Sequence, residues 1–577
     1  MKEISSPVYP SKDKPWLKYY TEEQLSVPLP ECTLYEMIWE NNKDSLDRIA
    51  IDYFGNKVTY KQMFENIDLA AKAYAAAGVK DGDIVIVSSV TIPELIYSVY
   101  ALNRLGAVPN MVDPRTSTEG IRDYILEVKA TLAVTIDVAY PRIARASEGT
   151  PVEKIISISP SDSMPAVLKG VMKLKAALEA NKPVNDIPVQ NWKSFIKDGK
   201  DVSYSPVAYT PKKCCVIVHT GGTTGMPKGV MLSNDNLNAV YSQAKNSPLK
   251  VKSGDKFLNI MPPFIAYGFS LGLHLVLSWG LTEIIIPKFD PESFDKLIIK
   301  HKPNALIGVP SYFDNLRNCK KLENYDLSFI KVLLSGGDKT QPEVEDRINT
   351  FFKEHNADIL LSKGYSMTEC SAMGTISYDN INKLGTVGIP LPKTTISIFE
   401  EGTDRELSCG EIGEICMQSP TMMIGYYNNQ EATDDLLRTH SDGLKWAHTG
   451  DLGYLDVDGM VHVEGRLKRM IIRHDGFKVF PPFIEDVVVT HPAIEDCCVV
   501  AQKDRVHGVG AMPFVFCTLK DGVSTEEEQI ISELKDICLD EIPEYSQPVG
   551  YKFVSQLPLT PIGKVDYRAL EEELNAL

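Results

Sequence analysis

Short runs of β-branched and other apolar residues alternate with longer stretches of helical pattern through the first several hundred residues. The apolar run 83–87 precedes a helical stretch at 92–105, and the run 132–136 follows a further helical stretch. Strands that alternate with helices are typical of parallel sheets joined by crossover helices. The pattern therefore predicts an α/β fold with parallel-rich sheets.

Three of the predicted strands run directly into polar, glycine-containing turns. The run 214–219 leads into a Gly/Thr-rich segment, 331–334 into the turn 335–338, and 358–361 into the turn 362–369. Ligands of open α/β sheets collect at the carboxyl ends of the strands. The three turns are therefore expected to line one nucleotide-binding crevice.

Two segments depart from this rhythm. Residues 159–200 are rich in Pro, Ser and Lys and are predicted to form a surface excursion. Its amphipathic stretch 167–178 either covers the core or forms a docking or membrane-surface patch. The most apolar region, 267–287, is interrupted by His274 and Glu283, so it is predicted to be a buried helix followed by a strand at 283–286. No membrane-spanning helix is expected.

The last part of the chain has a pattern of its own. Hairpin-like alternation at 454–463, with Asp458-Gly459 as the turn, precedes a predicted domain boundary between residues 466 and 467. Beyond it, strands at 497–501 and 514–519 and a helix at 525–539 are enough for a small α+β domain. We therefore expect a large domain over 1–466 and a small domain over 467–577.

The amino-acid composition limits which partners and which cellular compartment we expect for this chain. The formal net charge of −17 argues against nucleic acid or an anionic membrane surface as a general partner, since both require a basic face. The 11 cysteines include no C-x-x-C, so neither a zinc site nor a regular disulfide framework is indicated. The first residues lack an apolar signal region, and reduced thiols fit a cytoplasmic protein.

The densest chemical signal is the Gly/Thr run from Thr220 to Gly229, with Lys228 between Pro227 and Gly229. Glycines allow the backbone to approach a ligand closely, while hydroxyl and ammonium groups donate to phosphate oxygens. A Walker loop would require Gly-Lys-Ser/Thr at its end, which is missing here. A flexible surface loop would not need paired threonines or a Pro-Lys-Gly ending. The run therefore predicts a nucleotide triphosphate site.

The run resembles the phosphate-binding signature of the adenylate-forming superfamily, which includes acyl-CoA and aryl-CoA ligases, peptide-synthetase adenylation domains and insect luciferases. Further segments match the family's motifs in order: 58–60, 105–109, 410–415, 425–427, 449–451, 465–466, 542–545 and 558–564. The resemblance covers roughly residues 30 to 570. It implies parallel-rich sheets, a β-barrel-like subdomain and a mobile C-terminal domain.

The resemblance also implies a two-step reaction. A carboxylate attacks the α-phosphate of ATP to give an acyl adenylate, and coenzyme A then takes the acyl group as a thioester. An acyl-AMP ligase that loads a separate acyl carrier protein is the alternative, and a non-catalytic adenylate-binding regulator or a luciferase-type oxygenase shares the scaffold. A fatty or aromatic acid is favoured, because the expected pocket offers no carboxylate for a substrate amine.

Site residues follow from the matched motifs. Lys564 is expected to neutralise charge at the α-phosphate, and Glu369, assisted by Thr224 or Thr368, to bind Mg²⁺. The hinge is expected at Lys468, with Gly476 and Phe477 along the coenzyme A path. Nucleotide contacts are implied for Thr220, Gly221, Gly222, Thr223, Gly225, Lys228, Gly336, Gly337, Asp338, Gly364, Tyr365, Ser366, Thr368, Asp451 and Arg466. The acyl pocket is expected to be lined by Tyr267, Gly308, Val309, Ser335, Met367 and Met373.

For several of these residues the alternative is a role that has no part in binding or catalysis. Lys564 could be an exposed lysine, Glu369 a solvated loop carboxylate, and Tyr365 a tyrosine buried for its area alone. Asp451 and Arg466 could form an ion pair at a domain interface.

The chain also departs from the family pattern at three points. Tyr267 stands where many relatives have a histidine beside the carboxylate. The turn 473–479 is one residue longer than usual, and Phe483 replaces a commoner glutamate. The last two departures concern the second half-reaction rather than the first.

Overall fold

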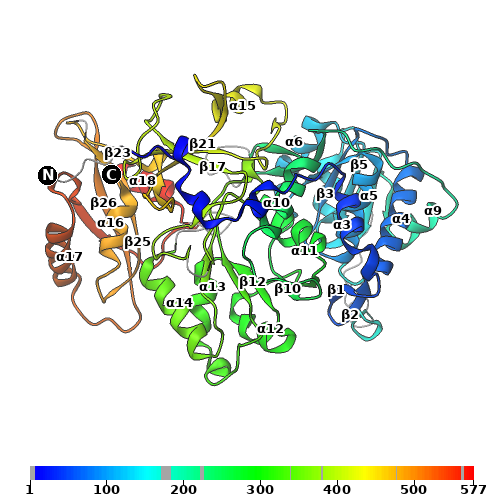
Figure 1. Cartoon of the computed structure of the whole chain (residues 1–577), viewed down its shortest axis with the longest axis horizontal. Helices are drawn as coiled ribbons and strands as arrows, with labels where there is room; N and C mark the ends of the chain where they lie inside the picture. The colour runs from blue at the N-terminus through cyan, green and yellow to red at the C-terminus, as the bar shows by residue number, and fades with distance from the viewer. Residues whose placement is uncertain are drawn as a thin grey trace.

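The computed structural model describes residues 7–169, 184–220, 227–337, 340–378, 381–475, 477–559 and 565–576. Its sheets and helices follow one another along the length of the molecule, and the last segments of the chain lie together at one end (Figure 1). The described helices are α1 Pro10–Asp13, α2 Glu22–Ser26, α3 Leu34–Asn42, α4 Tyr60–Ala76, α5 Pro93–Leu105, α6 Thr118–Val128, α7 Tyr140–Ser147, α9 Trp192–Asp198, α10 Asn234–Lys245, α11 Leu275–Ser278, α12 Phe294–His301, α13 Pro310–Asp314, α14 Pro342–Glu354, α15 Gln430–Leu436, α16 Pro481–Val488, α17 Glu527–Glu541 and α18 Tyr567–Ala576.

The first sheet has eight strands in the order β19-β9-β8-β4-β3-β5-β6-β7. Its bounds are β3 Ile84–Ser88, β4 Val108–Met111, β5 Leu132–Ile136, β6 Lys154–Ile158, β7 Val189–Asn191, β8 Cys214–His219, β9 Gly229–Ser233 and β19 Gly425–Tyr426. All neighbours from β8 to β7 pair in parallel, whereas β9 runs antiparallel to β8 and β19. The predicted strands at 132–136 and 214–219 and the helix α5 are confirmed.

The second sheet has seven strands in the order β14-β13-β12-β10-β11-β1-β2. Its bounds are β1 Ile49–Tyr53, β2 Asn56–Thr59, β10 Lys256–Asn259, β11 Thr282–Ile285, β12 Ala305–Gly308, β13 Val332–Ser335 and β14 Leu361–Lys363. Here the predicted strand at 358–361 is wrong, because β14 begins at Leu361 and includes Lys363. Glu345 forms a buried ion pair with Lys363 and so keeps this lysine inside the sheet.

The predicted surface excursion at 159–200 is wrong in its second half. Residues 189–191 form β7, which pairs in parallel with β6 at the end of the first sheet. Helix α9 follows and buries Trp192 and Phe195. Most of the amphipathic stretch 167–178 lies outside the described residues.

The apolar region 267–287 contains a buried helix and a strand, as predicted. A π-helix over Tyr267–His274 continues into α11, and β11 follows at Thr282–Ile285. Among the described residues, no helix combines the length and the apolar character needed to cross a bilayer.

An antiparallel sheet of five strands connects the parallel sheets with the end of the chain. It contains β17 Thr395–Phe399, β18 Gly413–Gln418, β20 Leu437–Thr439, β21 Lys445–Leu455 and β22 Val461–Arg466. Strands β21 and β22 form the predicted hairpin. Among the described residues, this antiparallel sheet is the part of the fold that corresponds to the predicted β-barrel-like subdomain.

The C-terminal region has a hydrophobic core of its own, which includes Ile484, Val499, Val515 and Leu534. Its sheet consists of β25 Ile494–Lys503, β26 Ala511–Leu519 and β27 Gly550–Phe553. The strands predicted at 497–501 and 514–519 lie within β25 and β26, and α17 begins two residues after the predicted helix start. The fold is therefore mixed α/β with parallel-rich sheets and a distinct C-terminal domain.

A fully buried carboxyl group in β11 makes the stability of the protein depend on pH. Glu283 accepts a hydrogen bond from Asn259 Nδ2 at 2.7 Å, and burial raises its pKa from 4.5 to about 8. The folded protein therefore keeps a proton that the unfolded chain releases near pH 4.5, so the free energy of unfolding falls as the pH rises through this window.

We expect Glu283→Gln, which resembles the neutral acid, to remove this dependence. Between pH 6 and 8 the unmodified protein should lose about 2 to 3 kcal/mol of unfolding free energy relative to the variant, at about 1.4 kcal/mol per pH unit. Urea unfolding at several pH values measures the difference. The exposed Glu292→Gln is the control, and parallel pH profiles for Glu283→Gln and the unmodified protein would contradict the assignment.

Candidate active site

The two ends of the loop after β8 are joined by hydrogen bonds. The Thr220 amide donates to the Lys228 carbonyl at 3.1 Å, and the Lys228 amide donates to Thr220 Oγ1 at 3.1 Å. Gly221, Gly222, Thr223, Thr224 and Gly225 lie outside the described residues. The last residue of β8, His219, contacts Asn110 Oδ1 through Nε2 at 2.6 Å, and burial lowers its pKa to about 4. The residue at the end of β8, directly before the loop in the sequence, is therefore a neutral imidazole at neutral pH.

Lys228, Tyr426 and Glu369 meet at this loop. Lys228 Nζ lies 4.8 Å from the centre of the Tyr426 ring, and the Tyr426 hydroxyl donates to Glu369 Oε1 at 2.5 Å. Glu369 is buried, and its carbonyl accepts the Met423 amide at 2.7 Å. Burial and the Glu369 carboxylate raise the pKa of Tyr426, so the phenol stays protonated and remains a donor. A cation, a phenol and a carboxylate from three distant segments thus form one cluster.

Tyr365, Asp451 and Arg466 form a second cluster. The Tyr365 hydroxyl donates to Asp451 Oδ2 at 2.7 Å, and Arg466 Nε lies 2.8 Å from Asp451 Oδ1. Burial, together with the Asp451 carboxylate, holds the pKa of Tyr365 well above its ordinary value. Asp451 is buried, whereas the Arg466 side chain is 58% exposed. The cluster therefore places one buried carboxylate beside an accessible guanidinium.

The segment from Gly364 to Glu369 supplies residues to both clusters. The Gly364 amide donates to the Ser335 carbonyl at 3.0 Å, which ties this turn to the end of β13. Thr368 and Glu369 belong to a 3₁₀ turn, and Ser366 Oγ contacts the Cys370 carbonyl at 3.5 Å. The turns after β13 and β14 are thus adjacent, as predicted from the strand ends.

Tyr267 lies against the glycines of the predicted acyl pocket. Its hydroxyl donates to the Gly308 carbonyl at 3.3 Å, and a methyl group on Gly336 would come within 3.2 Å of Tyr267 Oη. Gly337 has φ of +83°, a conformation that favours glycine. Ser335 and Met373 are buried, and Val309 and Met367 are half-buried. The structure therefore brings Tyr267, Gly308 and Gly336 together, while Asp338 lies outside the described residues.

The predicted residues of the C-terminal domain are only partly described. Lys468 belongs to a 3₁₀ turn at Leu467–Arg469, directly after β22. Gly476 and Lys564 lie outside the described residues. Phe477 is 51% exposed, and its ring stacks on Tyr545 with centroids 4.8 Å apart. An accessible aromatic pair thus stands beside the predicted coenzyme A turn.

Two polar contacts of the site were not predicted. Tyr426 belongs to a motif that the sequence analysis noted, but its contact with Glu369 depends on β19 pairing with β9. Glu414 likewise contacts the segment that carries Asp451, through the Gly450 amide at 3.1 Å. The repeated Gly-Glu-Ile at 410–415 was the available signal, and it does not say which glutamate points inward.

A Mg²⁺ ion would find a suitable oxygen ligand here. Mg²⁺ prefers carboxylate oxygens and is usually bound by one or two protein carboxylates together with substrate phosphates. Glu369 is buried and is linked through Tyr426 to Lys228, which follows the Gly/Thr-rich loop in the sequence. Its donor type therefore fits the metal that a nucleotide triphosphate brings.

A cavity of about 660 Å³ is lined by a different set of residues. Its lining combines the edge of the antiparallel sheet with the start of the C-terminal domain, including Arg405, Leu452, Met470 and Phe480. None of the predicted nucleotide or acyl residues contributes to it. We therefore place the candidate site at the strand ends.

Comparison with known proteins extends over nearly the whole chain. Residues 38–427 match the family described as AMP-binding enzyme, and residues 484–564 match the AMP-binding enzyme C-terminal domain. The chain is 30% identical to a long-chain-fatty-acid–CoA ligase of Bacillus subtilis, over 97% of this chain and 98% of the relative. It is also 30% identical to 4-coumarate–CoA ligase 2 of Petroselinum crispum, over 89% and 88% of the two chains.

A solved structure has the same fold. The crystal structure of ATP-bound MatB from Rhodopseudomonas palustris superposes with a TM-score of 0.79 at 21% identity, covering 93% of this chain and 98% of that one. At this identity the likeness establishes the fold.

Proposed function

This chain belongs to the AMP-binding enzyme family, and on that premise we propose that it is an AMP-forming acyl-CoA ligase. It activates a carboxylic acid with ATP through an acyl adenylate and then transfers the acyl group to coenzyme A. AMP and pyrophosphate are the other products. The proposal is supported by relatives named long-chain-fatty-acid–CoA ligase and 4-coumarate–CoA ligase, which align with this chain over most of their length.

The observation that carries the proposal is that the turn from Gly364 to Glu369, after β14, joins two polar clusters formed from separate segments. Lys228, with the Gly/Thr-rich loop, is suited to phosphate oxygens, and Glu369 to the ion that accompanies them. Asp451 is suited to accept hydrogen bonds from the two ribose hydroxyls, with Arg466 as a neighbouring donor. Tyr365 would lie along the adenine, next to the glycines at 336 and 337.

The main obstacle to the first step is the repulsion between two anions, the carboxylate and the α-phosphate. Positive charge fixed in place before reaction stabilises the charge that gathers on the phosphate. We assign this role to Lys564, carried by the C-terminal domain, and place the domain boundary between residues 466 and 467. Mg²⁺, held at Glu369 with help from Thr224, would neutralise charge on the phosphates.

The acyl pocket favours a fatty or aromatic acid. Gly308 and Gly336 lie against Tyr267, and the other predicted lining residues are Val309, Ser335 and two methionines, so none offers a carboxylate to pair with a substrate amine. The Tyr267 phenol, whose pKa is raised by burial, is a neutral donor where many relatives have histidine. We therefore assign to Tyr267 a contact with the substrate carboxylate or its adenylate.

Coenzyme A is the proposed acceptor. In this account the C-terminal domain turns about Lys468 after adenylation, so that the turn with Gly476 and Phe477 reaches the site. The stacked pair of Phe477 and Tyr545 offers an accessible aromatic surface for the incoming thiol substrate.

Pyrophosphate release with a panel of fatty and aromatic acids, with and without coenzyme A, tests this function. Repeated turnover that requires coenzyme A is the expected result, with AMP and thioester formed in equal amounts. A single burst of adenylate that coenzyme A does not change would instead indicate transfer to a carrier protein. Absence of pyrophosphate release with every acid would contradict the proposal as a whole.

A further inference from the structure

The segment that carries Asp451 is an irregular bulge in β21. Strand β18 pairs with β21 at Glu414↔Leu452 and again at Cys416↔His448, so β21 has two more residues than β18 between these pairs. Gly450, in the middle of the bulge, has φ of +68°. Bulges re-aim side chains and are common beside active sites. Here the bulge directs Asp451 toward Tyr365 and Arg466.

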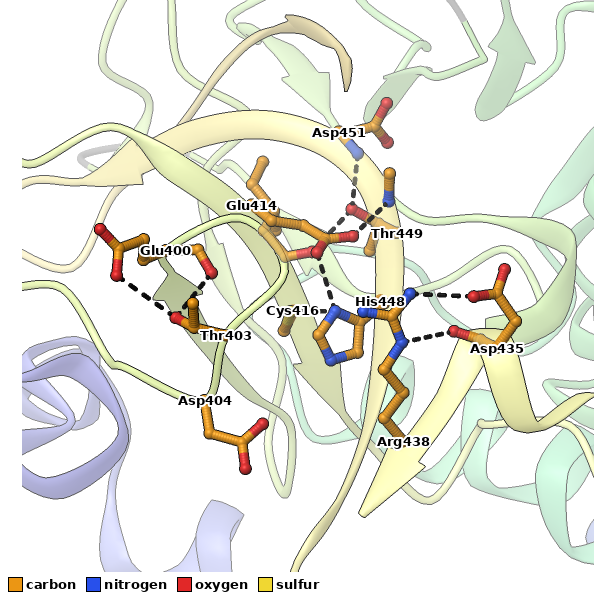
Figure 2. A network of polar contacts seen from close by, with 12 residues as sticks. Glu400, Thr403, Asp404, Glu414, Cys416, Asp435, Arg438, His448, Thr449 and Asp451 are labelled. Atoms are coloured by element: carbon orange, nitrogen blue, oxygen red, sulfur yellow. Dashed lines mark hydrogen bonds and ion pairs between the residues drawn. The ribbon is translucent and has the colours of Figure 1, made fainter. Parts of the chain in front are cut away.

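The Glu414 side chain bonds a backbone amide of the bulge in place of a partner from the neighbouring strand. Its Oε1 accepts the Gly450 amide at 3.1 Å, and its Oε2 lies 2.8 Å from His448 Nδ1. Figure 2 shows the carboxylate between the His448 ring and the bulged backbone. Glu414 is 5% exposed, and a buried carboxylate needs such partners to offset its lost hydration. One oxygen of Glu414 therefore holds the bulged backbone, and the other is bonded to His448.

Thr449 completes the support of the bulge. Its hydroxyl donates to the Ile415 carbonyl at 2.7 Å and accepts the Asp451 amide at 3.1 Å. The Gly450 amide is bonded by the Glu414 side chain and the Asp451 amide by the Thr449 side chain. Figure 2 shows the bond between Asp451 and Thr449. Backbone groups buried without partners would be costly, so these bonds select one conformation of the bulge.

Two histidines, His448 and His440, extend the hydrogen-bond network of Glu414. His448 Nε2 lies 2.8 Å from His440 Nε2. With both Glu414 oxygens as acceptors, His448 donates through Nδ1 and accepts from His440 through Nε2. Burial lowers the pKa of His440, which keeps this ring neutral, and the ring packs against Phe399 and Trp446. Its Nε2 also lies 3.8 Å from Asp404. The hydrogen-bond pattern is therefore one consistent chain from His440 to the bulge.

The same side chains resemble a metal site only in part. Ligand atoms of Glu414, Cys416 and His448 lie within 4.8 Å of one another. However, Cys416 packs in a small apolar cluster with Phe399 and Trp446, and burial raises the pKa of its thiol. A metal would need the thiolate. The carboxylate–imidazole bond satisfies these groups without an ion.

We propose that Glu414, supported by His448 and His440, is a positioning residue that holds the Thr449–Asp451 bulge in the shape that presents Asp451 to the nucleotide sugar. This inference rests on the proposed nucleotide role of Asp451. It gives a function to a buried side chain outside the predicted set of site residues.

Steady-state kinetics of Glu414→Ala and Glu414→Gln test the proposal. Glu414→Ala is expected to raise KM for ATP roughly 10- to 100-fold, with KM for the carboxylate unchanged within a few-fold. Glu414→Gln is expected to restore most of the affinity, since its amide oxygen can accept the Gly450 amide while the two histidines exchange tautomers. The exposed Glu411→Gln is the matched control and should behave as the unmodified enzyme. Should Glu414→Ala fail to fold, Thr449→Val removes the neighbouring support and should raise KM for ATP likewise.

Combination with Asp451→Ala separates this inference from the proposed function. If Glu414 acts through Asp451, Glu414→Ala should change KM for ATP little in the Asp451→Ala background. An additive loss in that background would overturn the positioning role, as would stoichiometric zinc in the purified protein or equal rises in both KM values. If Asp451→Ala alone leaves KM for ATP unchanged, the nucleotide role of Asp451 fails, whatever Glu414 does.

Discussion

Lys564→Ala is expected to abolish most of the adenylation activity while sparing thioester formation. Removing one preorganised donor to a developing charge lowers rates roughly 10²- to 10³-fold, and an ammonium beside the α-phosphate acts only while charge gathers there. The second step, in which the coenzyme A sulfur attacks the acyl carbon, does not need this group. Carboxylate-dependent pyrophosphate release should therefore fall by at least this factor.

Adenylation and thioester formation are measured separately. Thioester formation from supplied acyl adenylate and coenzyme A should stay within a few-fold of the unmodified enzyme. Lys535→Ala, at an exposed position on α17 of the same domain, is the matched control and should leave both steps unchanged. Equal loss of both steps in Lys564→Ala would contradict a domain that delivers this lysine for one step only.

Glu369→Gln is expected to cause the second-largest loss of adenylation activity, because it weakens the binding of Mg²⁺. The amide keeps the shape of the side chain and can still accept from the Tyr426 hydroxyl, but it removes the charge that binds a divalent cation. We expect adenylation to fall by about 100-fold or more, with the Mg²⁺ concentration for half-maximal rate raised by a similar factor.

Tyr426→Phe provides the graded comparison, because it removes only the hydrogen bond that orients the carboxylate. Its Mg²⁺ requirement should rise roughly tenfold, less than that of Glu369→Gln. Titration of the adenylation rate with Mg²⁺ at saturating ATP measures both variants. An unchanged Mg²⁺ dependence in Glu369→Gln would show that the ion is bound elsewhere.

The sequence predicted the fold best where local pattern and tertiary role agree. The β-branched runs at 132–136 and 214–219 are buried strands with the predicted bounds. The strand at 358–361 was misplaced because Lys363 looks like a turn residue, although it pairs with Ser335 in the sheet and its buried ammonium contacts Glu345 and the Lys383 carbonyl. Local periodicity contains no information about such a partner.

The same limit applies to the site. Tyr365 and Asp451 were both predicted to meet the nucleotide, and their 2.7 Å contact joins residues that are far apart in the sequence. The contact of Tyr426 with Glu369, and the bulge held by Glu414, could not be predicted. Each arises from strand pairing that brings distant motifs together, so single motifs indicate which residues matter but not which of them touch.

Transfer of an oxygen label tests the central claim most directly. A carboxylic acid labelled with ¹⁸O in both oxygens is incubated with the enzyme, ATP, Mg²⁺ and coenzyme A, and the AMP is analysed by mass spectrometry. If the carboxylate oxygen attacks the α-phosphate and the acyl carbon is then taken by sulfur, the AMP must contain one ¹⁸O atom and the thioester the other. AMP without the label, or ADP and phosphate in place of AMP and pyrophosphate, would contradict activation through an acyl adenylate.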